Sequence, residues 1–232
     1  LLDLIFSVFF SVTIFPVGFC SSAIFNCLSL FRQLLTRFCI LFFVTFFFYL
    51  LSKKIIQNLV KSCRNWDLLL NFAGDQNPIG KILTLKNTEI IRSFNINFLA
   101  QFIITKEILK FKKRNSFVLF FAGGGVNSAT MNYSTYTLSK IALIKLVELL
   151  DFEVKNTRFS IIGPGWVNTK IHNSTLISNK AGKNKKLTID KLKSSNLTSM
   201  NEIFDFFKWL YAQKKPIISG RNFSVVYDKN LN

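Results

Sequence analysis

The residues in this sequence with the clearest chemical potential are a tyrosine and a lysine four positions apart. Tyr136 and Lys140 lie in the stretch YTLSKIAL, whose apolar residues recur at helical spacing. Residues at positions i and i+4 of a helix are neighbours on its surface, so the phenol and the ammonium are expected to lie together. A free tyrosine has a pKa of about 10, too high for efficient proton transfer at neutral pH. Because a nearby ammonium stabilises the phenolate and lowers that pKa, the pair is a candidate acid–base catalyst.

The elements that must position this pair alternate between short apolar runs and longer segments with helical periodicity. The pattern predicts buried strands over 67–74, 116–125 and 158–169, a last short strand over 222–228, and helices over 53–66, 84–114, 133–154 and 201–215. Strands that alternate with helices favour a parallel sheet covered by helices on both faces, which is a doubly wound α/β fold.

The carboxyl ends of the predicted strands carry the turn residues that a binding site needs. The segments 71–74, 122–125 and 164–169 each end a strand and contain glycine. In open parallel sheets, ligands bind beyond the carboxyl ends of the strands. The sequence therefore predicts a site where these three turns approach the Tyr136–Lys140 pair.

These motifs resemble those of the short-chain dehydrogenase/reductase family, within the NAD(P)-binding Rossmann superfamily, over about residues 53–232. NFAG at 71–74 is similar to the family's NNAG turn, Tyr136 and Lys140 match its YxxxK signature, and GPGWVNT at 163–169 is similar to its PGxxxT turn. Asn97, in NINFLAQF, stands where the family's helix carries an asparagine. The resemblance implies a Rossmann-like doubly wound parallel sheet that is incomplete on its N-terminal side and follows a hydrophobic helical segment.

The resemblance also implies a reaction, which is reversible hydride transfer between the nicotinamide of NAD or NADP and a small-molecule carbonyl/alcohol pair. Tyr136 would be the acid–base, Lys140 its activator and a ribose ligand, and Asn97 part of a proton relay. The implied cofactor-binding residues are Asn71, Ala73, Gly74, Tyr136, Lys140, Pro164, Gly165 and Thr169. A homo-oligomer and a cytoplasmic location are expected on the same basis.

Two departures from the family pattern leave a second function open. The family's catalytic serine lies thirteen or fourteen residues before the tyrosine, where this chain has Gly123 and Ala122. Loss of one oxyanion donor typically lowers the rate by about 10²- to 10³-fold. The family's glycine-rich turn, TGxxxGxG, is absent as well, since residues 1–52 contain only Gly18. The alternative is therefore a catalytically inactive relative or an interaction protein, with membrane attachment as an option.

Residues 1–52 differ in composition from the remainder of the chain. They hold thirteen of the 27 phenylalanines, and their charge-free run from residue 4 to residue 31 is long enough to span a bilayer. The chain begins with Leu, which is compatible with a fragment. Three explanations stay open: a reading-frame error or decayed gene, a membrane anchor formed by residues 4–52, or a buried helical pair. The second would make the protein membrane-associated.

Composition argues against other classes of function. The formal charge is +18, but the basic residues are spread along the chain, and the lysine-rich segment 180–193 reads as a mobile polar loop. Nucleic-acid binding is therefore not predicted. The four cysteines lack CxxC spacing, and His172 is the single histidine, so no metal site is expected. We expect His172 to be exposed and Trp166 to be a packed residue beside the site.

Overall fold

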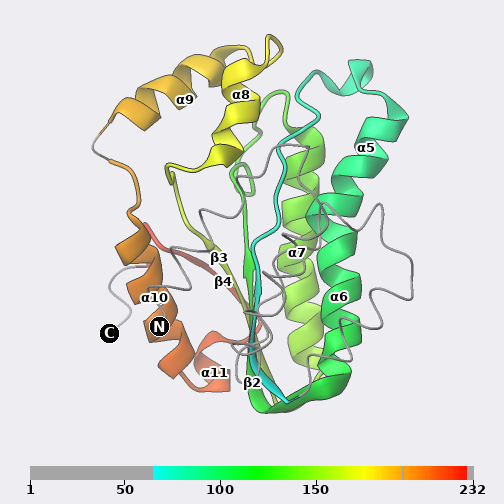
Figure 1. The fold of residues 1–232 in the computed structure, drawn as a ribbon, viewed down its shortest axis with the longest axis vertical. Helices are drawn as coiled ribbons and strands as arrows, with labels where there is room; N and C mark the ends of the chain where they lie inside the picture. Colours follow the sequence, from blue (N-terminus) through cyan, green and yellow to red (C-terminus); the bar gives the residue numbers. More distant parts are fainter. Residues whose placement is uncertain (1–64, 195, 229–232) are drawn as a thin grey trace, which may run out of the picture.

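The computed structural model describes residues 65–194 and 196–228, which form one parallel sheet with helices on both faces (Figure 1). The strands are β1 (Trp66–Asn71), β2 (Lys112–Phe121), β3 (Thr157–Gly163) and β4 (Arg221–Ser224). They pair in the order β1-β2-β3-β4, and all three pairings are parallel. The predicted doubly wound α/β fold is thereby confirmed.

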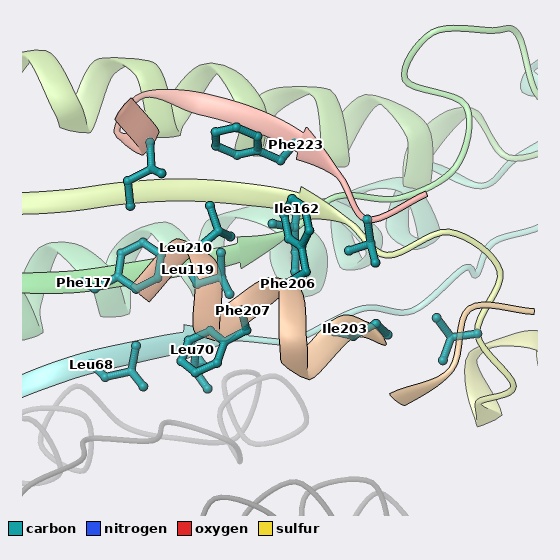
Figure 2. Packing of buried hydrophobic residues seen from close by; sticks show 13 residues of the cluster. Leu68, Leu70, Phe117, Leu119, Ile162, Ile203, Phe206, Phe207, Leu210 and Phe223 are labelled. Carbon is teal, nitrogen blue, oxygen red and sulfur yellow. The ribbon is translucent and has the colours of Figure 1, made fainter. Parts of the chain in front are cut away.

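Alternate residues of the strands supply two hydrophobic cores, one on each face of the sheet. On one face, Leu69, Val118 and Phe120 pack with residues of α6 (Ala100–Ile108) and α7 (Ser134–Glu153). On the other face, Leu68, Leu70 and Phe117 pack against α10 (Met200–Ala212), as Figure 2 shows. Strands that are buried on both faces need continuous apolar runs, which is why β1 reads WDLLLN and β2 ends in FVLFF.

The long predicted helix over 84–114 is present as a chain of helical pieces that ends earlier than expected. These pieces are η2 (Ile82–Thr84), α5 (Asn87–Phe94), the π-helical turn η3 (Asn95–Leu99), α6 and η4 (Leu109–Phe111). Residues 112–114 were predicted as helix, but they begin β2. Their basic side chains suit a helix, yet pairing with β1 decides the outcome, because Trp66 is opposite Lys112 and Lys113 forms an ion pair with Asp67 at 2.8 Å.

The segment after β3 also differs from its prediction. It contains η5 (Lys170–His172), α8 (Asn173–Ile177) and α9 (Lys183–Lys193), so the mobile polar loop expected over 180–193 is wrong. Lysine and leucine are good helix formers, and tertiary contacts hold this helix in place. Thr188 is buried, and the Asn184 Nδ2 donates to the Met131 carbonyl at 2.8 Å.

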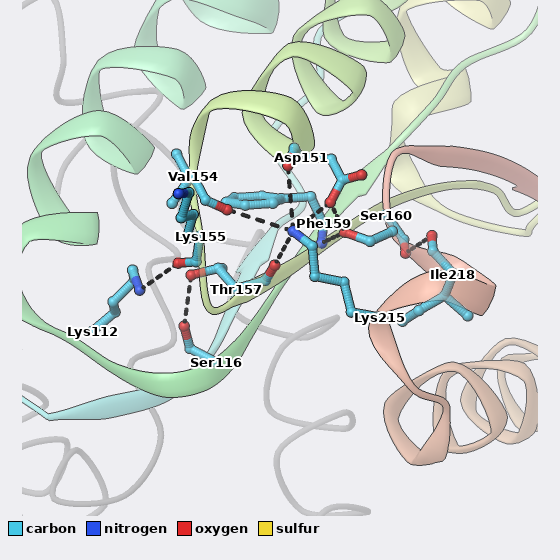
Figure 3. Close-up of polar contacts among 11 residues, drawn as sticks. Lys112, Ser116, Asp151, Val154, Lys155, Thr157, Phe159, Ser160, Lys215 and Ile218 are labelled. Carbon is cyan, nitrogen blue, oxygen red and sulfur yellow. Dashed lines mark hydrogen bonds and ion pairs between the residues drawn. The ribbon is translucent and has the colours of Figure 1, made fainter.

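The amino ends of the strands are held by polar contacts around α11 (Lys215–Ile218) (Figure 3). Lys215 Nζ donates to the carbonyl of Thr157 at 2.9 Å and forms an ion pair with Asp151 at 2.5 Å. Ser219 Oγ donates to Asp151 and accepts the backbone N–H of Phe159. These contacts join the end of α7 to the start of β3, at the amino ends of the strands, whereas the predicted site lies at their carboxyl ends.

The predicted hydrophobic helical segment, residues 1–52, lies outside the described residues, as does most of the predicted helix over 53–66. Within residues 65–194 and 196–228, no helix combines the length and the apolar character that a membrane crossing requires. The predicted membrane spans fall on residues 4–52 and stay predictions.

Candidate active site

Tyr136 and Lys140 lie one turn apart in α7, on the side of this helix that faces the carboxyl ends of β1 and β2. Both side chains are buried, at 7% and 2% exposure. The Lys140 Nζ lies 5.8 Å from the centroid of the Tyr136 ring. The helix spacing therefore brings the two groups together, as the sequence predicted, and the surrounding fold encloses them.

The Lys140 ammonium connects the carboxyl ends of the neighbouring strands β1 and β2. Its Nζ donates to the backbone carbonyls of Ala73 and Phe121, each at 3.0 Å, which are the residues that follow β1 and end β2. Burial lowers the pKa of Lys140 from 10.5 to about 7, since these partners are neutral carbonyls rather than carboxylates. An ammonium has three N–H donors, and the described residues engage two of them.

The pKa of Tyr136 shifts in the direction opposite to the sequence prediction. Burial raises this pKa well above 10, whereas the nearby lysine was expected to lower it. The reason is that the phenolate would lose its hydration inside the fold. Lys140 does not reverse this shift, and its own pKa near 7 leaves it only partly charged at neutral pH. Tyr136 is therefore a protonated phenol at neutral pH.

Gly123 lies directly beside the Tyr136 hydroxyl. A Cβ atom added to Gly123 would lie 2.6 Å from the Tyr136 Oη, closer than real contacts allow. Ala122 instead points into the core on the α7 face. Of the two candidate serine positions, Gly123 is thus the one beside the phenol, and a side chain there requires the tyrosine ring to move.

Asn97 holds the loop that follows β1. It lies in the π-helical turn η3, fully buried, where its Oδ1 accepts the Asp75 N–H and its Nδ2 donates to the Asp75 carbonyl, both at 2.8 Å. The remaining Nδ2 hydrogen goes to Ser93 Oγ at 3.2 Å. π-Helical turns often occur at functional sites, because they displace the regular hydrogen-bond ladder.

Sequence reasoning missed Gln101, which supports the same loop. Its Nε2 donates to the carbonyls of Ala73 at 3.1 Å and Asn97 at 2.8 Å. The Ala73 carbonyl thus accepts from both Gln101 and Lys140. The available signal was the i,i+4 spacing of Asn97 and Gln101 on one helix.

Gly74 is where the predicted residues converge. A Cβ atom at this position would lie 3.7 Å from Lys140 Nζ, 4.0 Å from Asn97 Oδ1 and 3.4 Å from the Ile171 side chain. Asn71, three residues earlier, is buried and donates from Nδ2 to Thr105 Oγ1 at 3.4 Å, which ties β1 to α6. The first predicted turn therefore meets the lysine and the asparagine directly.

The Pro164–Thr169 turn follows β3 at the same edge of the sheet. Gly165 has a φ of +78°, in the region that glycine favours, and lies against Thr198 and Val226. Thr169 precedes η5, and its carbonyl accepts the His172 N–H at 3.3 Å. The link from this turn to the Tyr136–Lys140 pair runs through Ile171, whose side chain approaches Gly74.

Buried polar contacts hold the segment after β3 against the turns beside the site. The Tyr133 and Thr175 hydroxyls are 2.6 Å apart, and Thr175 also donates to Gln76 Oε1 at 2.8 Å. Trp166 stacks on His172 with ring centroids 5.2 Å apart. The expectation of an exposed His172 is wrong, because the ring is buried and its Nε2 pairs with the Val167 carbonyl at 3.0 Å. This burial lowers the pKa of His172.

The chain is similar in sequence to known short-chain dehydrogenases and to one curated protein. The family model described as short chain dehydrogenase matches residues 51–180, which is more than half of the chain. General stress protein 39 of Bacillus subtilis (strain 168) is 31% identical over 64 residues, 28% of this chain and 22% of that protein. The match therefore spans about a fifth of the length of this curated relative.

Several solved structures share the fold. The KRED1-Pglu enzyme aligns with a TM-score of 0.64 at 20% identity, over 74% of this chain and 75% of that one. A short chain dehydrogenase of Escherichia coli CFT073, complexed with NADPH, aligns with a TM-score of 0.62 at 17% identity, over 76% and 71%. A small-chain dehydrogenase in complex with NADPH gives 0.63 at 15% identity, over 75% and 78%. At these identities the similarity shows the fold.

Proposed function

The chain belongs to the short-chain dehydrogenase family, and from that premise we propose that it is an NAD(P)-dependent oxidoreductase acting on a carbonyl/alcohol pair. The observation that carries the proposal is the arrangement at the carboxyl ends of β1 and β2, where Lys140 and Asn97 both approach Gly74 and the Tyr136 ring lies 5.8 Å from the Lys140 Nζ. Carbonyl reduction requires the protein to supply a proton donor and to position the cofactor beside it.

The residues around Gly74 suit the ribose and nicotinamide part of a dinucleotide. The third N–H of Lys140, which the described residues leave unengaged, is a donor for a ribose hydroxyl. Gly74 has no side chain, so a ligand group can approach its backbone more closely than at other residues. The cofactor would be bordered, beyond the carboxyl ends of β1 and β3, by Ala73, Pro164, Gly165 and Thr169. When bound, the nicotinamide supplies or accepts the hydride.

Tyr136 is proposed to transfer the proton. Burial raises its pKa, so the phenol is protonated at neutral pH, which is the form that can donate to a carbonyl oxygen. The same shift makes the phenol a weaker acid, so the transfer depends on the negative charge that develops on that oxygen as hydride arrives. In the oxidation direction Tyr136 must instead accept a proton, which a raised pKa disfavours until the pH is high. The protonated phenol is thus the state of Tyr136 that carbonyl reduction uses.

Asn97 is proposed to act mainly by positioning the loop after β1, with a proton relay as the further role expected from the family. Its two side-chain N–H groups are both engaged, by the Asp75 carbonyl and Ser93 Oγ. An amide oxygen has two lone pairs, and the Asp75 N–H uses one. The other lone pair is what supports the relay, since Asn97 Oδ1 and Lys140 Nζ both lie near Gly74.

The lack of a hydroxyl group at Gly123 is expected to lower the turnover rate. A serine hydroxyl there would be a second donor to the developing oxyanion, and without it turnover should be about 10²- to 10³-fold lower than in a site that has one. The comparisons give no support to the alternative of an inactive relative. The proposal is therefore a slow oxidoreductase rather than a protein without activity.

Cofactor binding and turnover test this proposal separately. Titration with NADPH and with NADH, followed by cofactor fluorescence, should show saturable binding of at least one. Tyr136→Phe should then lower carbonyl reduction at least about 100-fold while affinity stays within about threefold, because the phenol acts in proton transfer. Tyr227→Phe is the control, since Tyr227 is 88% exposed. No saturable binding of either cofactor, or unchanged turnover in Tyr136→Phe, contradicts the proposal.

A homo-oligomer is proposed on the surface of α5, α6 and α7. Large apolar side chains are exposed along these helices and the π-turn between two of them: Ile91, Leu99, Ile103, Leu138, Ile141 and Leu149. Exposed apolar side chains that gather on neighbouring helices are typical of protein interfaces. Light scattering on the purified chain measures the number of copies, and a monomer at all concentrations contradicts the proposal.

A further inference from the structure

A second surface feature lies at the end of the molecule that holds the site. Three segments, residues 80–87, 130–132 and 177–187, follow β1, β2 and β3 respectively. Their large apolar side chains are exposed, with Leu83 at 97% and Ile177 at 79%, and with Ile82, Met131 and Leu187 also exposed. We call these three segments together the lysine–aliphatic surface.

Hydrogen bonds join the three segments into one surface. The Gly80 N–H donates to the Asn132 carbonyl at 2.9 Å, and Asn132 Nδ2 donates to the Lys180 carbonyl at 2.7 Å. The Asn184 Nδ2 donates to the Met131 carbonyl at 2.8 Å. In Figure 1 the start of α5 and the helices α8 and α9 lie at the same end of the fold. The apolar side chains are therefore held on a fixed platform rather than on independent loops.

The charges within these three segments have a single sign; beside them, Glu89 and Arg92 line a pocket together with Lys180. The three segments contain six lysines and no aspartate or glutamate; the lysines are Lys81, Lys86, Lys180, Lys183, Lys185 and Lys186. They contain no arginine and no aromatic residue. Proteins that bind single-stranded nucleic acid use aromatic and arginine side chains to stack on bases, which this surface lacks. Lysines interleaved with exposed aliphatic side chains instead match the interface of an anionic bilayer.

We propose that the lysine–aliphatic surface docks on a membrane that contains anionic phospholipid. The lysines contact the lipid headgroups, and Leu83 and Ile177, the most exposed aliphatic side chains of the surface, insert at the boundary with the acyl chains. This contact is separate from any membrane span within residues 4–52, because it depends on surface charge and on side chains of the folded domain. It also turns the carboxyl ends of the strands, where Tyr136 lies, toward the lipid.

Vesicle binding tests the electrostatic part of the proposal. The full chain should bind phosphatidylcholine vesicles that contain phosphatidylserine at least about tenfold more tightly than vesicles without it, and salt raised from about 0.1 M to 1 M should remove that difference. Lys180→Gln combined with Lys183→Gln should weaken the binding about tenfold or more. The matched control combines Lys155→Gln with Lys214→Gln, two lysines outside the surface that are also exposed.

Insertion is tested at Leu83, with Phe152 as the control. Phe152 is 91% exposed near the end of α7, so it is a comparable apolar side chain outside the surface. After subtraction of the parent emission, the tryptophan in Leu83→Trp should shift to shorter wavelength when phosphatidylserine vesicles are added, and that in Phe152→Trp should not. Equal binding to both kinds of vesicle with no effect of the lysine changes, or shifts at both tryptophans, overturns the proposal. So does preferential binding to an oligonucleotide that the same lysine changes abolish.

Discussion

Replacing Lys140 with methionine should change how the free energy of unfolding depends on pH. Burial lowers the pKa of Lys140 from 10.5 to about 7. Between these values the unfolded chain binds a proton that the folded protein lacks, so the stability of the parent protein rises with pH across this window. Each pH unit corresponds to 1.36 kcal/mol, and the whole window therefore to about 5 kcal/mol. Methionine does not titrate, so Lys140→Met should lose this dependence of stability on pH.

Urea unfolding at pH 7, 8 and 9, followed by tryptophan fluorescence, measures the effect. The free energy of unfolding of the parent should rise relative to that of Lys140→Met by about 1 kcal/mol between pH 7 and 8, where the folded lysine is still losing its proton, and by about 1.3 kcal/mol between pH 8 and 9. The range stops below pH 10, because the raised pKa of Tyr136 makes stability fall with pH above that value. Lys145→Met is the control, since Lys145 lies on the same helix but is exposed. If the parent and Lys140→Met give parallel curves, the lysine is not buried as a near-neutral amine and the reasoning is refuted.

Three further substitutions have expected outcomes. Gly123→Ala should lower the free energy of unfolding by about 1–3 kcal/mol, because its Cβ would meet the Tyr136 hydroxyl at 2.6 Å; unchanged stability in urea would show that the ring moves freely. Thr175→Val removes the partner of a buried tyrosine hydroxyl and should destabilise by about 1–3 kcal/mol in the same assay. Lys215→Met should lower the melting temperature through loss of charge-assisted bonds worth about 1.5–3 kcal/mol, whereas Lys214→Met, an exposed neighbour, should not; equal shifts would contradict this.

Much of the fold followed from local patterns in the sequence. The strands were predictable because apolar runs such as DLLLN and SFVLFF end in glycine-containing turns, and parallel buried strands need such runs. The boundary at Lys112 was not predictable from the residues around it. Three basic residues suit a helix end as well as a strand start, and only the pairing with β1 distinguishes the two. The same holds for α9, whose place depends on contacts with the segment around Met131.

For the site, the sequence by itself determined which groups share a helix face and in which order the turns follow one another. Tyr136 and Lys140 are neighbours because a helix brings positions i and i+4 together whatever surrounds it. Only the tertiary structure decided their chemistry. Burial by the sheet and the neighbouring helices raises the pKa of Tyr136 and lowers that of Lys140, and it places Gly123 rather than Ala122 against the phenol. Hydration and steric contact depend on atoms that are distant in the chain, so no local pattern contains them.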